Sequence, residues 1–113
     1  MNEFSWFDTL SAAVTVCDLN GIVIAMNDKA GDAFAKYGGK DLIGKSLMDC
    51  HNPHSQDMIR GMMVTGKTNA YTIEKKGIKK MIYQTPWYTE GRIAGLVEIS
   101  MEIPPEMPHF VRE

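Results

Sequence analysis

The chain has 113 residues, of which 44% are hydrophobic and 23% are charged, and its formal net charge is −2 at pH 7. This length allows one domain with a single core, and the composition is that of a folded globule rather than of a disordered chain. Acidic and basic residues are interspersed, so we expect no basic surface of the kind that binds nucleic acid.

Two further features bear on where the protein works. The sequence has no run of about 18 apolar residues that could span a membrane, and its start, MNEFSWFDTL, lacks the basic and apolar regions of a signal peptide. Two cysteines, Cys17 and Cys50, make no disulfide framework and suit a reducing compartment. We therefore expect a cytoplasmic protein that binds neither nucleic acid nor membrane.

The first elements in chain order are a helical segment and a pair of strands. Residues 1–11 are expected to be helical and to carry three large apolar side chains that are candidate interface residues: Phe4, Trp6 and Phe7. Alternating apolar and polar side chains predict a strand over 13–18. Asn20-Gly21 favours a tight turn, so residues 22–26 are expected to return as the paired strand.

Residues 27–65 are predicted to form a helical block. Asn27 is a natural N-cap for a short amphipathic helix, which a Gly-Gly pair at 38–39 ends. A longer helix is expected over 53–64, because Asn52 can cap it and a proline stands at its first position. The apolar face of that helix carries Met58, Ile59, Met62 and Met63.

Three more strands are predicted after the helices, over 68–75, 79–88 and 92–103. Pro86 falls inside the second of them, so it should lie beyond the end of a neighbouring strand or at a bulge. This order of elements predicts an α+β fold with one antiparallel sheet and helices packed on one face. The domain core would cover 12–103, and a proline-rich segment over 104–113 would leave it as an extended tail.

The last strand has the clearest alternation in the chain. Strict alternation puts Val97 and Ile99 on its apolar face, toward the helices. The same pattern puts Glu98 and Glu102 on the opposite face, where solvent or a partner would meet them.

The stretch 21–55 resembles the PAS sensor domain in the order of its parts. A strand runs into an N-x-x-A helix start at Asn27, an aromatic residue precedes a glycine, the motif L-I-G-K-S follows at 42–46, and a proline opens the long helix. The glycines of the final hairpin, Gly91 and Gly95, extend this similarity to about residues 8–103. The chain is also similar to the PAS-like domains that accompany hemerythrin-like domains in bacteria.

This resemblance implies a five-stranded antiparallel sheet in the order 2-1-5-4-3 and a ligand pocket between the sheet and the helices. The residues that would line the pocket are Met26, Phe34, His51, His54, Met58, Ile59, Met62, Tyr83, Thr85, Val97 and Ile99. The alternative is that these side chains only fill a close-packed core.

The cluster Cys50-His51-x-x-His54 allows three interpretations. His54 could be an axial haem ligand, although it precedes the position of the haem-binding histidine in PAS sensors. Cys50, His51 and His54 could hold a metal together with His109. The interpretation that we favour is a loop with local hydrogen bonds and no metal. The reactive-cysteine motif of flavin-binding LOV domains is absent, because Leu47 holds that position, and only non-covalent flavin stays open.

We find no catalytic constellation in the sequence and expect a protein that is not an enzyme. The function predicted is that of a PAS-type sensor for signal transduction, which binds a small ligand and acts through a homodimer or a separate signalling protein. One alternative is an interaction module that dimerises without a ligand, and another is a haem-binding PAS sensor. The identity of any ligand or cofactor is left open.

Overall fold

The computed structural model describes residues 5–113, apart from the side chain of Cys50. Three 3₁₀ segments join the helices that follow the first hairpin: 35–37, 39–42 and 47–50. The helices are α1 (Ser5–Thr9), α2 (Asp28–Ala33) and α3 (Pro53–Thr65), and the strands are β1 (Ala13–Asp18), β2 (Val23–Met26), β3 (Asn69–Lys75), β4 (Ile78–Thr89) and β5 (Arg92–Glu102).

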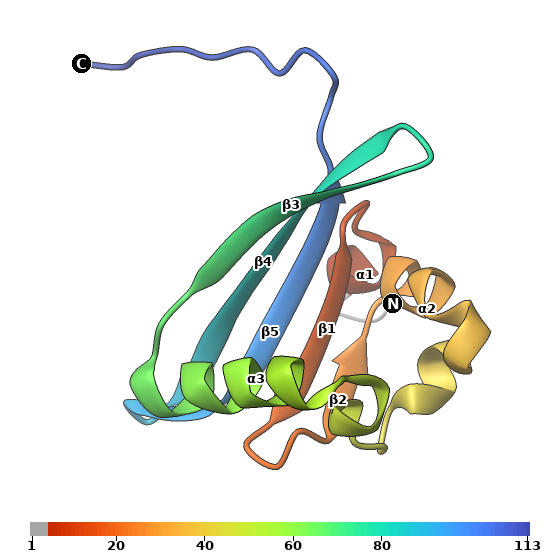
Figure 1. Cartoon of the computed structure of the whole chain (residues 1–113), viewed down its shortest axis with the longest axis vertical. Coiled ribbons are helices and arrows are strands. Elements are labelled where there is room, and N and C mark those ends of the chain that lie inside the picture. The colour runs from red at the N-terminus through yellow and green to blue at the C-terminus, as the bar shows by residue number, and fades with distance from the viewer. Residues whose placement is uncertain (1–4) are drawn as a thin grey trace.

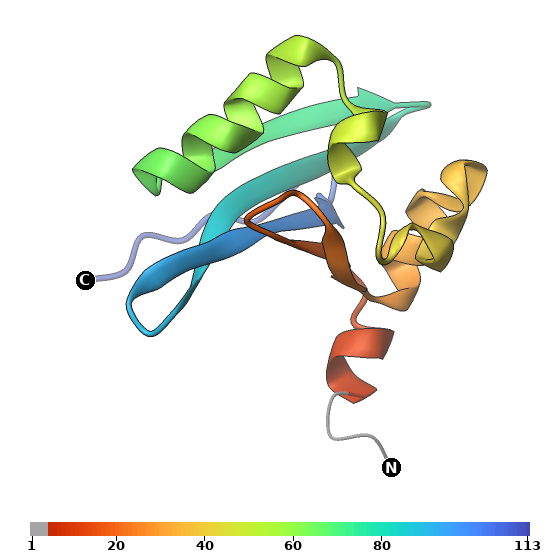
Figure 2. The same ribbon diagram turned by 90° about the horizontal axis from the view of Figure 1, so that it is seen from below.

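The five strands form one antiparallel sheet in the order β2-β1-β5-β4-β3 (Figure 1). Helix α3 lies across one face of this sheet, which we call the inner face, and the opposite face is the outer face (Figure 2). Helix α1 projects from the end of the sheet where α2 lies (Figure 2). The α+β class, the strand order and the placement of helices that the sequence predicted are confirmed.

Local interactions determine where the helices α2 and α3 begin and where α3 ends. The side chain of Asn27 accepts a hydrogen bond from the backbone N–H of Ala30 at 3.0 Å and so caps α2. Asn52 caps α3 in the same way through Ser55, at 2.9 Å. Helix α3 ends at Gly66, whose φ of 79° is the left-handed conformation that glycine adopts at low cost.

The core lies between α3, the helical segments and the inner face. One buried cluster joins α3 to the middle strands and consists of Cys17, Ile59, Met62, Met63 and Leu96. A second lies beneath α2 and consists of Val23, Met26 and Ala30. Among residues 5–113 no helix is long and apolar enough to cross a membrane. Phe4, the first of the predicted interface residues, lies outside the described residues.

The pairing of β4 with β5 contains one irregularity that decides which side chains face the helices. Trp87 pairs with Gly95, whereas Tyr88 pairs with Ile93, so Ala94 is an extra residue in a bulge. Pro86 lies just before this bulge and beyond the last residue of β4 that pairs with β3, as the sequence predicted. The bulge changes the phase of the strand, so Ile93 and Leu96 share the inner face.

Candidate functional site

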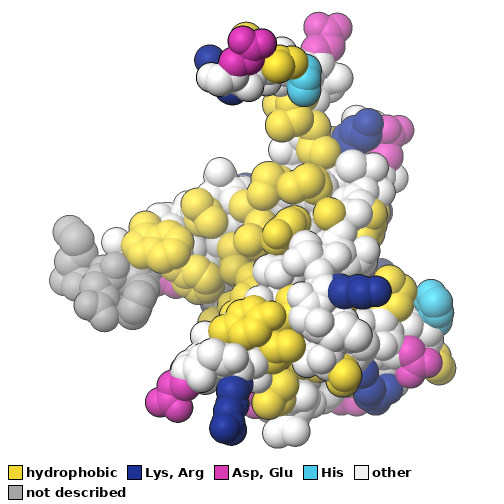
Figure 3. Space-filling view, turned by 90° about the vertical axis from the view of Figure 1, so that its left-hand side faces the viewer, with side chains coloured by type: hydrophobic (Ala, Val, Ile, Leu, Met, Phe, Trp, Pro, Cys, Tyr) yellow, Lys and Arg dark blue, Asp and Glu magenta, His cyan; other side chains and the backbone are white. Residues whose placement is uncertain are grey.

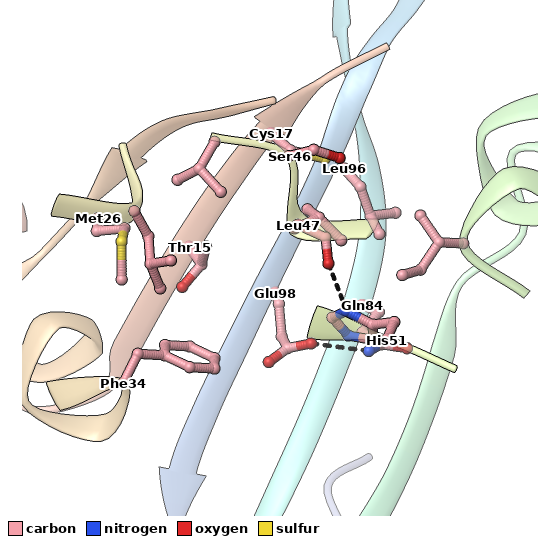
Figure 4. Close-up of a pocket in the computed structure, with 13 residues that line it drawn as sticks. Thr15, Cys17, Met26, Phe34, Ser46, Leu47, His51, Gln84, Leu96 and Glu98 are labelled. Carbon is pink, nitrogen blue, oxygen red and sulfur yellow. Dashed lines mark hydrogen bonds between the residues drawn. The ribbon is translucent and has the colours of Figure 1, made fainter. Parts of the chain in front are cut away.

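A cavity of about 60 Å³ lies between the inner face, α2, the 3₁₀ segments and α3 (Figure 4). A cavity needs about 10–15 Å³ to hold one water molecule, so this one is larger than a packing defect. Most of its wall is apolar, and the apolar residues are Cys17, Val23, Met26, Phe34, Leu42, Leu47, Ile59 and Leu96. The polar ones are Thr15, Ser46, His51, Gln84 and Glu98.

The polar side chains gather on neighbouring strands. Gln84 on β4 donates a hydrogen bond to a carboxylate oxygen of Glu98 on β5, at 2.8 Å, and accepts one from Asn69 on β3, at 3.0 Å. The amide of Gln84 is therefore held in one orientation, with its nitrogen toward the carboxylate. Gln84 is 8% exposed, so this chain of hydrogen bonds stands in a region of low polarity, where it is stronger than in water.

His51 reaches the cavity from the loop between the last 3₁₀ segment and α3 (Figure 4). Its Nδ1 atom lies 2.7 Å from the backbone oxygen of Leu47, which can only accept, so Nδ1 carries the proton. Gln56 on α3 donates to the backbone oxygens of Met48 and His51, each at 2.9 Å. These bonds tie the loop to α3 and fix the imidazole against the cavity.

A wider groove of about 580 Å³ opens beside the cavity, between α3 and the inner face of β3 and β4. Five residues line both spaces: Phe34, His51, Ile59, Gln84 and Glu98. The groove is also lined by Met58 and Met62 from α3, and by Tyr71 and Ile73 from β3. The small cavity therefore lies next to a wider groove, and three of its polar residues, His51, Gln84 and Glu98, line both spaces.

The structure brings some of the predicted pocket residues together. Met26, Phe34, His51 and Ile59 line the cavity, and Met58 and Met62 line the groove. His54 is exposed and lines neither space, so it is not placed to ligate a haem there. His109 is exposed in the tail. Among the described side chains, no group of three His, Cys, Asp or Glu residues could hold a metal ion.

The expectation that four sheet residues face the helices is wrong. Leu96 and Glu98 line the cavity, so alternation turns Val97 and Ile99 to the outer face. The same holds for Tyr83 and Thr85, which pair with Ile99 and Val97. Glu98, which the sequence placed on a solvated or interface-facing side, points into the cavity instead.

Sequence reasoning placed His51 in the site but missed Gln84 and Glu98, and for a physical reason. An apolar stripe predicts the inner face only where the opposite face is polar, but this sheet carries apolar side chains on both faces. The signal that could have found Glu98 was in β4, where Ile82, Gln84 and Pro86 alternate with Tyr83 and Thr85. A glutamine inside such a strand needs a hydrogen-bond partner, and Glu98 is the carboxylate that lies opposite it on the neighbouring strand.

Two groups near the cavity have shifted proton affinities. Burial raises the pKa of the Cys17 thiol, an effect that the backbone N–H of Leu96 partly opposes. This thiol therefore stays protonated at neutral pH and acts as a small apolar wall residue. Partial burial also raises the pKa of the Tyr71 phenol, with a further contribution from the charge of Glu98.

Comparison with known proteins agrees with this architecture. Residues 7–68, more than half of the chain, match the sequence profile of the PAS fold. The chain therefore belongs to the PAS-fold family. No match is found among curated protein sequences.

Several solved structures share the fold. The VqmA dimer of Vibrio cholerae superposes with a TM-score of 0.70 at 21% identity, over 90% of this chain and 50% of that one. A PAS domain from Colwellia psychrerythraea gives 0.63 at 23% identity, over 87% and 91% of the two chains. A sensory box sensor histidine kinase from Vibrio cholerae gives 0.61 at 18% identity, over 87% and 86%. The chain thus spans about half the length of VqmA.

Proposed function

We propose that this chain is a PAS-type sensory domain that binds a small molecule in the cavity and the adjoining groove. The observation that carries this proposal is the cavity itself, which has apolar walls and a few converging polar groups, as small-molecule sites do. VqmA, which shares the fold, has been solved bound to DPO. The domain would act as a binding module rather than as an enzyme.

Signalling would need a surface that differs between the free and the bound state. The outer face is a candidate, because it carries partly exposed apolar side chains: Val16, Ile24, Met81, Tyr83, Trp87, Val97, Ile99 and Met101. Figure 3, which views the molecule from the left-hand side of Figure 1, shows hydrophobic side chains gathered in one broad band. We propose that this face pairs with a second copy, and that Trp6 and Phe7 of α1 contribute to the contact.

Thermal unfolding in the presence of a metabolite library tests ligand binding. A compound that binds only the folded state at about 100 times its Kd should raise the free energy of unfolding by about 2.7 kcal/mol. Thr15→Leu should fill the cavity and remove that shift. Thr72→Leu is the matched control, because Thr72 is exposed on the outer face of β3. If no compound shifts the wild type, the ligand-free dimerisation module becomes the better interpretation.

Cellular location and the absence of nucleic-acid binding remain predictions from the sequence. We propose a cytoplasmic protein, because its two cysteines make no disulfide framework and suit a reducing compartment. That the chain binds no nucleic acid rests on its charge alone, and it stays a prediction. An electrophoretic mobility assay with random duplex DNA at low salt would test it.

A further inference from the structure

The fixed charge in the walls of the cavity and the groove is negative. Glu98 is the one carboxylate among the described residues that line either space, and neither space has a lysine or an arginine in its wall. Among the described side chains, His51 is the only other titratable group that lines both. A ligand that carried a carboxylate or a phosphate would therefore meet a negative charge and no fixed positive one.

The hydrogen bonds of the site leave an acceptor atom free on each of two residues, Glu98 and His51. One oxygen of Glu98 is occupied by Gln84, and the other makes no hydrogen bond with the described residues. The Nδ1–H group of His51 donates a hydrogen bond to the backbone oxygen of Leu47, so in the neutral imidazole Nε2 is an acceptor. Asn69 directs the Gln84 nitrogen toward Glu98, so Gln84 stabilises the carboxylate rather than competing for a ligand.

The surrounding walls define the rest of the ligand. Phe34 and Ile59 line both the cavity and the groove, beside the carboxylate. Met58 and Met62 extend this apolar wall along α3, and methionine adapts to ligands of different shapes. A molecule in this position would bury an apolar body against the helix and present its polar end to the sheet.

We propose that the ligand is a small, mainly apolar molecule with a nitrogen that donates a hydrogen bond to Glu98, and that this nitrogen is cationic or part of an N–H group. This inference rests on the proposed sensory function and names the chemical class that the same site selects. Glu98 would be the residue that determines specificity, since a charge-assisted hydrogen bond in a partly buried site is about twice as strong as a neutral one. A ligand that lacks the donor would leave the second oxygen of the carboxylate, the one that Gln84 does not occupy, without a partner.

Three matched probes test this selectivity: benzylamine, benzyl alcohol and benzoate. Each is titrated into ¹⁵N-labelled protein, and the backbone amide signals of β4 and β5 are followed. We expect benzylamine to shift the amides of Gln84 and Glu98 in a saturable manner. We expect it to bind about tenfold or more tightly than benzoate.

Substitution at the carboxylate isolates its contribution. Glu98→Gln keeps the shape of the side chain but replaces the charged acceptor, so benzylamine should bind about tenfold more weakly while benzyl alcohol changes little. Glu102→Gln is the matched control, because Glu102 lies on the same strand, is exposed and lines neither the cavity nor the groove. It should leave the binding of all three probes unchanged.

The comparison of probes on the wild type needs no variant, so the proposal can fail even if Glu98→Gln does not fold. Equal binding of benzoate and benzylamine would overturn the selectivity but leave the cavity as a ligand site. An affinity of Glu98→Gln for benzylamine equal to that of the wild type would likewise overturn the selectivity and leave the cavity as a ligand site. If none of the probes moves these amides, the ligand class is also wrong, and the library screen described above decides separately whether the site binds any small molecule.

Discussion

Asn27 joins the first strand to the first helix of the core. Its side-chain oxygen accepts from the backbone N–H of Val14 at 2.9 Å as well as from that of Ala30, and its amide donates to the backbone oxygen of Ala12 at 2.8 Å. The residue is fully buried. One side chain thus satisfies three backbone groups, in β1, in the residue before it and in α2, which explains why a polar residue can occupy the core here.

Loss of the Asn27 side chain should lower the free energy of unfolding. Asn27→Ala removes a helix cap, worth about 1 kcal/mol, and leaves the buried N–H of Val14 without a partner, worth about 1–3 kcal/mol. We therefore expect urea unfolding to show a loss of about 2–4 kcal/mol. A change within about 0.5 kcal/mol for Asn27→Ala would contradict this role.

Gly95 is required where β1, β4 and β5 meet. A Cβ atom at this position would lie 1.9 Å from the backbone oxygen of Cys17 and 2.7 Å from Nε1 of Trp87. The indole crosses the glycine to donate a hydrogen bond to that same oxygen, at 3.0 Å. The absent side chain therefore lets an aromatic residue of β4 reach β1.

Gly95→Ala should separate these strands and lower the free energy of unfolding by at least about 3 kcal/mol. The matched control is Gly61→Ala on the exposed surface of α3, where an added Cβ would meet nothing within 4 Å. That change should stabilise the protein by up to about 1 kcal/mol, because alanine is the better helix former. Thermal or urea unfolding compares the two variants, and similar effects would argue against a special role for Gly95.

At the level of the elements, the sequence predicted the secondary structure more accurately than it predicted which face of the sheet each side chain occupies. Caps and turn residues act locally, so Asn27, Asn52 and Pro53 placed the helix starts correctly. The facing of β5 depends instead on the extra residue in the bulge at Ala94, which changes the phase of the strand. A bulge of this kind arises from the pairing of two strands, and no local signal in the sequence marked it. For that reason the apolar wall of the site was predicted in part, whereas Glu98 and Gln84 were missed.

The outer face of the sheet leads to a prediction about assembly. Ile99→Lys places a charge at the middle of this face and should convert a dimer into a monomer, because a lysine there would be buried without a partner. Light scattering on the purified protein measures the change in mass. Val64→Lys, at a position of α3 that is 82% exposed, is the control and should leave the mass unchanged.

Deletion of residues 1–10 tests the helical contribution to the same contact. We expect the deletion to weaken the dimer, because it removes Trp6 and Phe7 together with the rest of α1. If both this deletion and Ile99→Lys leave the mass as it is in the wild type, the outer face is not the interface between copies.

The whole molecule combines two surfaces that a sensor needs. Among the described residues, the inner face holds a cavity and a groove with a single carboxylate that lines both, and the outer face carries the apolar side chains that we propose meet a second copy. Strand β5 contributes to both, since Glu98 points inward and its neighbours Val97 and Ile99 point outward. A ligand that contacts Glu98 would thereby act on the strand that also carries the proposed partner surface, which would give a direct route for coupling between the two.

The most direct measurement is an amide chemical-shift map of the wild-type protein with the best compound from the metabolite library. We expect a saturable set of shifts centred on Thr15, Leu47, His51, Gln84 and Glu98, which line the cavity from four different segments. The same compound should produce no such shifts in Thr15→Leu and should produce them fully in Thr72→Leu. Shifts confined to the outer face, or shifts that survive in Thr15→Leu, would contradict a ligand site between the sheet and the helices.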